Sequence, residues 1–268
     1  MKRCAFAGIL LAVSFVSGVA EAGDRAVYKA PPPISDAAAP GVFYAGLSLG
    51  GRWSDTDWMT TAIGSPPSAA NFGPANPASF DSSTARIGGY VGYMWRIAPP
   101  WVVGIEGDIA WGDSSKSVAA IPGTCSRIGC GGIAHIEEGW DGSIRGRFGF
   151  LLTPSWLLYA TGGIAWQGVG VEASCVGPKA SFCRTAHSES VSSTEAGWTL
   201  GAGLEVMLRR NWLVRLEYRF AGYGHLDHTF FAGPPADRVV MNESLKTQTL
   251  LLGFAYKLGP GASVVAKH

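Results

Sequence analysis

Residues 101–112 read Trp-Val-Val-Gly-Ile-Glu-Gly-Asp-Ile-Ala-Trp-Gly, and this stretch decides the fold. In an extended chain, one of its faces carries Trp101, Val103, Ile105, Ile109 and Trp111. The opposite face carries Glu106 and Asp108. Apolar and charged positions that alternate with a period of two indicate a β-strand, and no helical spacing of three or four residues competes with this pattern.

The same alternation recurs along the chain beyond residue 41. It predicts eight strands, at 43–51, 84–95, 101–112, 140–152, 156–168, 198–208, 212–220 and 247–258. Three connections are short, at 96–100, 153–155 and 209–211. Four connections are long, near 52–83, 113–138, 173–195 and 224–245. Because short and long connections alternate strictly, we expect an antiparallel up-and-down meander whose two ends differ, as in outer-membrane barrels.

Tryptophans decide which face of the strands points outward. Eight of them share the parity of the apolar face and lie at strand ends: Trp95, Trp101, Trp111, Trp140, Trp156, Trp166, Trp198 and Trp212. Indole rings prefer the boundary between membrane and water. The ten residues from Trp101 to Trp111, in a strand tilted by about 40°, span about 25 Å, the height of the apolar band of such barrels. A soluble barrel of the lipocalin kind, with its apolar face inside, does not explain two aromatic belts. The sequence therefore predicts an all-β fold, an eight-stranded transmembrane β-barrel with short periplasmic turns and four long extracellular loops.

The charged face of these strands then lines the lumen. Its predicted members are Arg52, Arg86, Glu106, Asp108, Asp141, Arg145, Arg147, Glu205, Arg215, Glu217 and Arg219. An eight-stranded barrel is only wide enough for side chains to fill it. Since single buried charges are costly, we expect these groups to pair across the lumen as a network. The network is interpreted first as a polar plug that fixes the strand register, and second as a narrow path for ions; a proton relay or catalysis is the remaining reading.

Composition and the chain ends place the protein in the cell envelope. Lys plus Arg is 21 and Asp plus Glu is 20, so the basic excess of a nucleic-acid binder is missing. Residues 1–22 have the basic start, apolar run and small-residue site of a cleaved secretory signal. Residues 23–41 are rich in proline and predict a periplasmic linker, which is followed by the barrel at 42–258 and a tail at 259–268.

The cysteines and histidines offer little chemistry. Cys125 and Cys130 lie in the second predicted long loop, and Cys175 and Cys183 lie in the third. In an exported chain they predict disulfides; proximity favours two local bridges, and loop-crossing pairings stay open. His225 and His228 are weak candidates for a metal or haem site.

No enzyme, and no cofactor, is expected. None of the eight predicted strands contains a histidine, which argues against a membrane-embedded lipid hydrolase or acyltransferase. A phosphate-binding loop and a His-Glu-x-x-His motif are also missing from the sequence. The sequence therefore offers no candidate catalytic residue.

Five phrases in chain order resemble a known family. They lie at 43–46, 88–93, 156–163, 197–205 and 216–220. Together they resemble the small outer-membrane proteins of alphaproteobacteria, the RopB-type members of the superfamily that includes opacity proteins and OmpA-like barrels. The resemblance covers about 42–258 and implies an eight-stranded barrel with surface-exposed loops and no catalytic residues. Family members usually end on an aromatic residue, whereas here 259–268 follow the last predicted strand.

Three functions are compatible with these observations. The first is a non-enzymatic barrel that stabilises the outer membrane of a Gram-negative bacterium and presents its loops outside. The second is a porin-like channel for small solutes, and the third is a surface protein that binds haem or a host or envelope ligand through its loops. The expected partners are outer-membrane lipid and the barrel-insertion machinery, with such a ligand at the loops under the third hypothesis.

Overall fold

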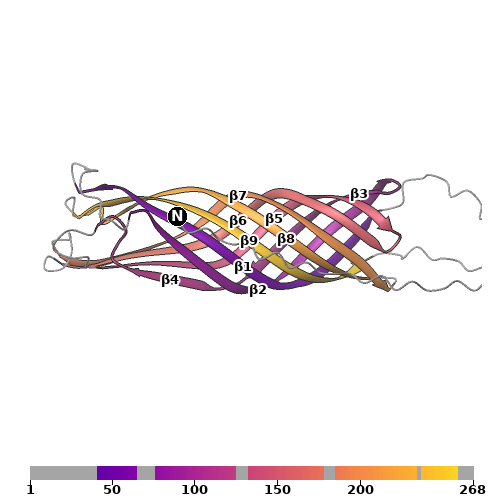
Figure 1. The fold of residues 1–268 in the computed structure, drawn as a ribbon, viewed down its shortest axis with the longest axis horizontal. Helices are drawn as coiled ribbons and strands as arrows, with labels where there is room; N and C mark the ends of the chain where they lie inside the picture. The colour runs from indigo at the N-terminus through magenta and orange to yellow at the C-terminus, as the bar shows by residue number, and fades with distance from the viewer. Residues whose placement is uncertain are drawn as a thin grey trace, which may run out of the picture. The chain divides into compact units, whose positions relative to one another are not determined.

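The computed structural model describes residues 41–64, 76–124, 132–177, 185–209, 211–233 and 237–258, with the side chains of Arg209 and Leu226 excepted. Nearly all of these residues lie in nine strands (Figure 1). The strands are β1 (Val42–Ile63), β2 (Ala78–Ala98), β3 (Trp101–Trp111), β4 (Ser114–Ala119), β5 (Ile133–Thr153), β6 (Trp156–Val176), β7 (Ala186–Arg209), β8 (Trp212–Phe230) and β9 (Val239–Leu258). Among the described residues, no helix has the length and apolar character needed to cross a membrane.

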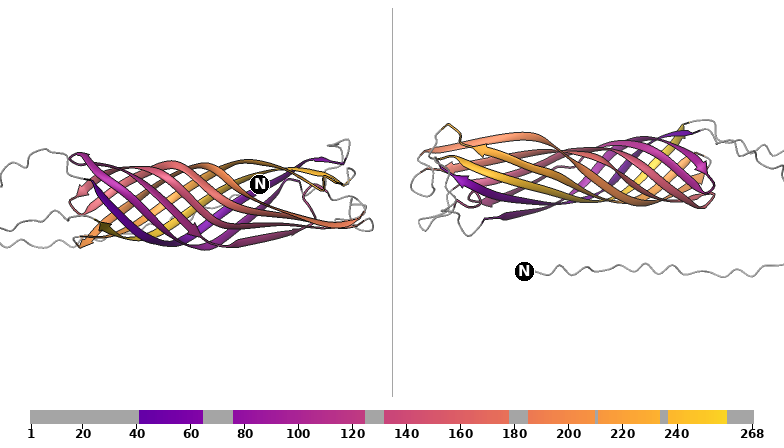
Figure 2. Two further views of the ribbon diagram at one scale, coloured as in Figure 1. Left: turned by 180° about the vertical axis from the view of Figure 1, so that it is seen from behind. Right: turned by 90° about the horizontal axis from the view of Figure 1, so that it is seen from above.

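The strands close into a ring. Every neighbouring pair is antiparallel, and β1 pairs with both β2 and β9, which joins the first strand to the last. Both β3 and β4 pair with β5, so they form one strand that is interrupted at Gly112 and Asp113. The result is a barrel with a ring of eight strands, as predicted, and Figures 1 and 2 show them tilted around a common axis.

The predicted strands are too short. Seven of the observed strands have between 19 and 24 residues, and they extend far into the four segments that the sequence assigns to long loops. For example, β1 continues to Ile63 and β2 already begins at Ala78, although 52–83 is predicted as a loop. The barrel wall therefore continues well beyond the outer tryptophans, and the extracellular connections shrink to residues 64–77, 120–132, 177–185 and 231–238.

The middle of the barrel has its apolar side chains outside. Seven of the eight predicted tryptophans are exposed at the barrel surface, and Trp166 is partly exposed. Between the two levels of tryptophan lie exposed aliphatic side chains such as Ile105, Ile144 and Leu200. Trp53 also points outward near the extracellular level, although it is not among the eight tryptophans predicted for the aromatic belts. This band is the surface that meets lipid.

Beyond this band the arrangement is reversed. In the extracellular part of the barrel the inward positions form an apolar core around the fully buried Trp58, whose ring stacks on Phe230 at 5.8 Å. Further members of this core, which we call the extracellular core, are Phe80, Ile121, Ile136, Val169, Val171, Ala173, Met241 and Leu245. The same strands thus hold apolar residues outside within the membrane and inside above it.

On β5, a β-bulge accounts for this change of the residues that point inward. Glu138 pairs with Val169 and Asp141 with Gln167, so two residues of β5, Gly139 and Trp140, face one residue of β6. A bulge shifts the alternation of side chains by one residue. As a result, inward positions are odd-numbered below the bulge and even-numbered above it, where Ile136 and Glu138 are buried.

Residues 1–40 and 259–268 lie outside the described residues. The predicted signal, most of the predicted linker and the predicted tail therefore stay predictions. The same holds for Cys125, Cys130 and Cys183 and for their disulfides.

Candidate functional site: the charged lumen

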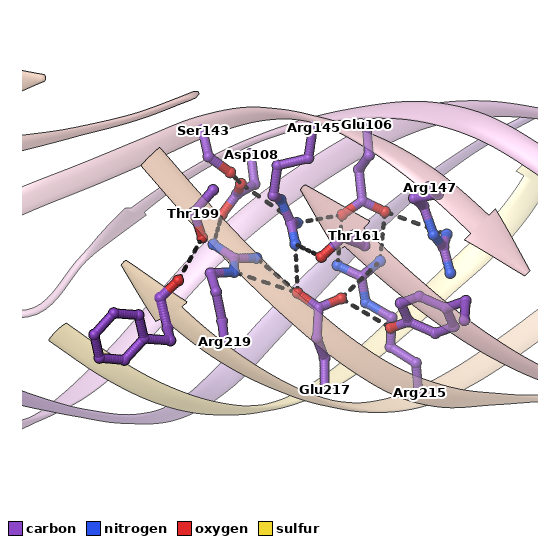
Figure 3. A network of polar contacts seen from close by, with 12 residues as sticks. Glu106, Asp108, Ser143, Arg145, Arg147, Thr161, Thr199, Arg215, Glu217 and Arg219 are labelled. Atoms are coloured by element: carbon purple, nitrogen blue, oxygen red, sulfur yellow. Dashed lines mark hydrogen bonds and ion pairs between the residues drawn. The ribbon is translucent and has the colours of Figure 1, made fainter. Parts of the chain in front are cut away.

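All eleven predicted lumen charges lie inside the barrel, with side chains that are at least nine-tenths buried. They come from six strands, β1, β2, β3, β5, β7 and β8, because each strand presents every second residue to the lumen. Figure 3 shows how most of them converge in the middle of the barrel. We call these residues, together with Glu138, the lumen network.

Glu106 on β3 is the centre of the network. Its carboxylate accepts hydrogen bonds from Arg145 at 2.6 Å, from Arg215 at 3.1 Å and from Arg147 at 3.4 Å. The hydroxyl of Tyr44 donates a fourth hydrogen bond at 2.8 Å. One fully buried carboxylate therefore binds three guanidinium groups from two strands, β5 and β8, on either side of the lumen.

A second carboxylate, Glu217 on β8, shares these cations. It lies 2.5 Å from Arg145 and 3.0 Å from Arg219, and it accepts a hydrogen bond from the Tyr159 hydroxyl at 2.8 Å. Arg145 therefore bridges Glu106 and Glu217 across the barrel (Figure 3). Such charge-assisted bonds, with both partners satisfied, are what makes buried charge tolerable.

Toward the extracellular side, two aspartates continue the network. Asp108 accepts from Arg86 and from Arg219, both at 2.9 Å, and from the Ser143 hydroxyl. Asp141 pairs with Arg86, whose Nε lies 2.9 Å away, and with Arg52 at 3.0 Å. Five strands, β1, β2, β3, β5 and β8, are joined in this layer, so its geometry depends on the register of the closed ring.

Toward the periplasmic side, arginine also packs on tyrosine rings. Arg147 pairs with Glu205 at 3.0 Å, and its guanidinium lies 4.0 Å from the centre of the Tyr159 ring. The Arg215 guanidinium lies 3.6 Å from the centre of the Tyr90 ring. These cation–π contacts fill the lumen where carboxylates become fewer.

The sequence reading missed one member of the network. Glu138 on β5 is buried, lies 3.5 Å from Arg52 and accepts hydrogen bonds from Ser54 at 2.5 Å and Ser82 at 3.2 Å. It shares the parity of the lipid-facing residues below it, and only the bulge at Gly139 and Trp140 turns it inward. The predicted lumen charges comprise six arginines and five carboxylates; with Glu138, six arginines face six carboxylates and the formal charges balance.

Little space remains between these side chains. A cavity beside Arg52, Asp141 and Arg219 has a volume of about 10 Å³, and another beside Arg147 and Tyr159 also has about 10 Å³. Such a volume holds about one water molecule. The middle of the lumen is therefore filled by side chains, whereas a hollow of about 310 Å³ lies beside Glu205 and Met207 at the periplasmic end. The chemistry of the filled part is that of a matched ionic plug.

The histidines do not lie where the sequence reading placed them. His135 on β5, His187 on β7 and both His225 and His228 on β8 belong to strands, so the expectation that strands lack histidine is wrong. They lie in the extracellular extensions of these strands, which the sequence predicts as loops. His228 packs edge-on against Phe230 at 4.6 Å, and among the described residues no group of three potential ligands could hold a metal ion.

Of the five cysteines in the chain, only Cys175 lies in the described residues, and it is buried in the extracellular core.

Comparison with known proteins agrees with this geometry. The model of the family described as "Outer membrane protein beta-barrel domain" matches residues 9–257. The chain belongs to this family. It is 28% identical over 246 residues to the 25 kDa outer-membrane immunogenic protein of Brucella abortus, covering 90% of this chain and 92% of that protein. It is also 33% identical over 156 residues to the 22 kDa outer membrane protein of Rhizobium leguminosarum, covering 57% of this chain and 60% of that protein.

Solved structures of similar architecture include the outer membrane protein OprG of Pseudomonas aeruginosa, with a TM-score of 0.46 and 12% identity over 80% of this chain and 96% of that one. The Ail protein of Yersinia pestis has a TM-score of 0.37 and 13% identity over 80% of this chain and 98% of that one. The family membership places this barrel in the outer membrane of a Gram-negative bacterium, with its outward band in contact with membrane lipid.

Proposed function

We propose that this protein is a non-enzymatic structural barrel that is anchored in the outer membrane, stabilises the envelope and presents its extracellular half to the outside. The observation that carries the proposal is the filled lumen, in which six arginines and six carboxylates are paired. Above them lies the extracellular core around Trp58. A barrel whose lumen is closed at two levels, by the lumen network and by the extracellular core, has the architecture of a stable structural protein.

The filled lumen argues against the porin-like alternative. An ion that entered would have to separate buried pairs, and removing one partner of such a pair typically costs about 3–5 kcal/mol. It would then meet the extracellular core, where apolar side chains offer no replacement for its hydration shell. Both barriers lie in series along the same lumen.

Catalysis would need a different arrangement of groups. General acid–base chemistry requires a titratable side chain within hydrogen-bond reach of a substrate. The carboxylates of the lumen network are instead saturated by arginines and enclosed by the barrel wall. This supports a structural role for them. Assembly of such a closed ring in a membrane also implies the barrel-insertion machinery as a partner.

Two measurements test the proposal together. Purified wild-type protein in a planar lipid bilayer should show no discrete conductance steps. A strain that lacks the protein should become more sensitive to detergent, and the wild-type gene should restore its resistance. The variant Ile105→Arg, which we expect to insert poorly, should fail to restore it. Regular conductance steps that change size in Glu106→Ala, or an envelope that is equally resistant without the protein, would refute the structural role.

A further inference from the structure

A hollow lies on the outer wall of the barrel, just above the level of the extracellular tryptophans. It has a volume of about 660 Å³, within the ~300–1,000 Å³ range of small-molecule sites. Strands β4 to β7 contribute its lining. The lumen network does not use this hollow, apart from Glu138 at its inner edge.

Two glycines of β6 form the floor of the hollow. Gly168 and Gly170 occupy positions where neighbouring strands carry side chains, so β6 has no outward side chain of its own there between β5 and β7. A methyl group added at Gly168 would lie 2.7 Å from Nε1 of Trp140, so the indole lies directly over this backbone. A methyl group added at Gly170 would lie 3.9 Å from both Oε2 of Glu137 and Oγ of Ser192.

These groups have the composition of a saccharide site. A sugar presents apolar C–H groups on its ring faces and hydroxyl groups around its edge. The exposed indole of Trp140 offers an apolar face with one N–H donor, and the carboxylate of Glu137 accepts hydrogen bonds from two hydroxyls at once. Ser192 and Thr194 add hydroxyls that both donate and accept. His135 binds Glu137 at 3.0 Å and orients its carboxylate.

The charge of the hollow selects among saccharides. Glu137 and Asp113 give it exposed carboxylates, the charge of Glu138 is balanced by Arg52, and none of the described lining residues is basic. Like charges placed side by side repel, so a phosphate or a uronic acid is disfavoured, whereas a neutral or amino sugar is accepted. The position of Trp140, at the outer boundary of the lipid-facing band, puts the hollow at the height of lipid head groups and of any sugars that they carry.

We propose that the hollow over Gly168 and Gly170 binds a neutral or amino sugar unit of an oligosaccharide, which lies on Trp140 and is held by Glu137 and Ser192. The sugar comes either from a glycolipid of the same membrane or from a free oligosaccharide, since both offer the same ring and hydroxyls. This site is separate from the lumen network and does not depend on the structural role proposed above.

The test measures saccharide binding by the full-length barrel in lipid nanodiscs. Three probes are used: N-acetylchitotriose, which is neutral, chitosan trimer, which is cationic, and trigalacturonate, which is anionic. Calorimetry gives the affinity, and the indole N–H signal of Trp140, assigned with Trp140→Phe, reports the place of binding. We expect the neutral or the cationic trimer to bind and to shift that signal, and the anionic trimer to leave it unchanged.

Two variants and a matched control make the test specific. Gly170→Leu fills the hollow, and its nearest neighbours at 3.6–3.9 Å leave room for the first side-chain atom. Glu137→Gln removes the carboxylate. Each should weaken binding about tenfold or more, equivalent to about 1.4 kcal/mol. Ser190→Leu, an exposed residue on the same face of β7 outside the lining, should bind as wild type does.

The outcomes separate the two sources and decide the proposal. Binding only when the trimer is attached to a nanodisc lipid assigns a glycolipid, and equal binding of the free trimer assigns an oligosaccharide from solution. The site is refuted if no neutral or cationic trimer binds, either free at millimolar concentration or attached to a nanodisc lipid. It is equally refuted if Gly170→Leu binds as tightly as wild type, or if only trigalacturonate binds.

Discussion

At the scale of single residues, adjacent positions on one strand have opposite environments. Ile105 is exposed to lipid, whereas Glu106 is the fully buried centre of the lumen network. This contrast follows from the period of two and is predictable from the sequence alone. The partners of Glu106 are not predictable in this way, because they come from β1, β5 and β8 and depend on the register of the closed ring.

Glu106→Ala should destabilise the barrel strongly. The substitution leaves Arg145, Arg147 and Arg215 without their shared carboxylate, and breaking a buried pair typically costs about 3–5 kcal/mol. Ser143→Ala is the control, since Asp108 keeps Arg86 and Arg219 and loses one hydroxyl donor, worth about 1 kcal/mol. The temperature at which heat-modifiable gel mobility is lost measures both, and equal midpoints would contradict the role of Glu106.

Ile105→Arg tests the other face of the same strand. A basic side chain near the middle of the lipid-facing band costs roughly 2–4 kcal/mol in membrane barrels. We expect a smaller fraction of protein in the heat-modifiable form in outer-membrane fractions. Ser190→Leu, on the exposed wall above the membrane, should insert as wild type does. Normal insertion of Ile105→Arg would mean that this face does not meet lipid.

At the scale of elements, β5 shows what the sequence leaves undetermined. Its lower part, where Arg145 and Arg147 alternate with lipid-facing residues, is predictable because the period of two is unbroken. Its upper part is not, because one extra residue at the bulge gives Ile136 and Glu138 the opposite orientation from the one that the same period would assign. The extracellular core was missed for a related reason: its apolar residues lie in segments rich in Gly, Ser and Pro.

Deletion of Gly139 should make the inward orientations of the two halves of β5 incompatible with each other. Without the extra residue, either Ile136 and Glu138 turn outward or Arg145 and Arg147 leave the lumen network. Because ion pairs hold the lower half in the lumen, we expect the upper half to lose its inward orientation. Limited proteolysis of the inserted barrel should then cleave near residues 133–138, where wild type resists. Full resistance in the deletion variant would show that the bulge does not set the alternation.

Glu243 on β9 predicts a pH dependence of the extracellular half. Burial, reinforced by repulsion from Glu195 and Glu138, raises the pKa of Glu243 from 4.5 to about 7, and its buried Oε2 has no hydrogen-bond partner among the described residues. The folded state holds this proton more tightly than the unfolded state between these values, so stability falls as the pH rises from about 4.5 to about 7. Above about pH 7 this loss of stability is complete and no longer changes with pH.

Glu243→Gln should remove that loss. Its thermal midpoint should exceed that of wild type at pH 8 and approach it at pH 4.5, since the wild-type carboxyl is then protonated in the folded state. Asp113→Asn is the control, because Asp113 is exposed and this substitution should leave the pH profile of wild type unchanged. A constant difference between Glu243→Gln and wild type at all pH values would exclude titration of Glu243 as the cause.

At the scale of the whole barrel, one ring of strands is adapted to two surroundings, lipid around its membrane half and water around its extracellular half. Its membrane half keeps charges inside and apolar residues outside, and its extracellular half keeps apolar residues inside. The first half is predictable, because tryptophan belts and alternating charges mark it in the sequence. The second requires knowledge of how far the strands continue beyond the membrane, which no local pattern specifies.

A filled lumen predicts how stability responds to salt. At about 1 M salt the screening length is about 3 Å, so exposed ion pairs weaken, whereas pairs that water and ions cannot reach are screened much less. The thermal midpoint of wild type should therefore change little between about 0.05 M and 1 M sodium chloride. Glu106→Ala should be less stable than wild type but should respond to salt as little, because Arg145 and Arg215 lie in the same part of the lumen. A steep fall of the wild-type midpoint with salt would mean that ions already reach the lumen network, and the structural role would then give way to the porin-like one.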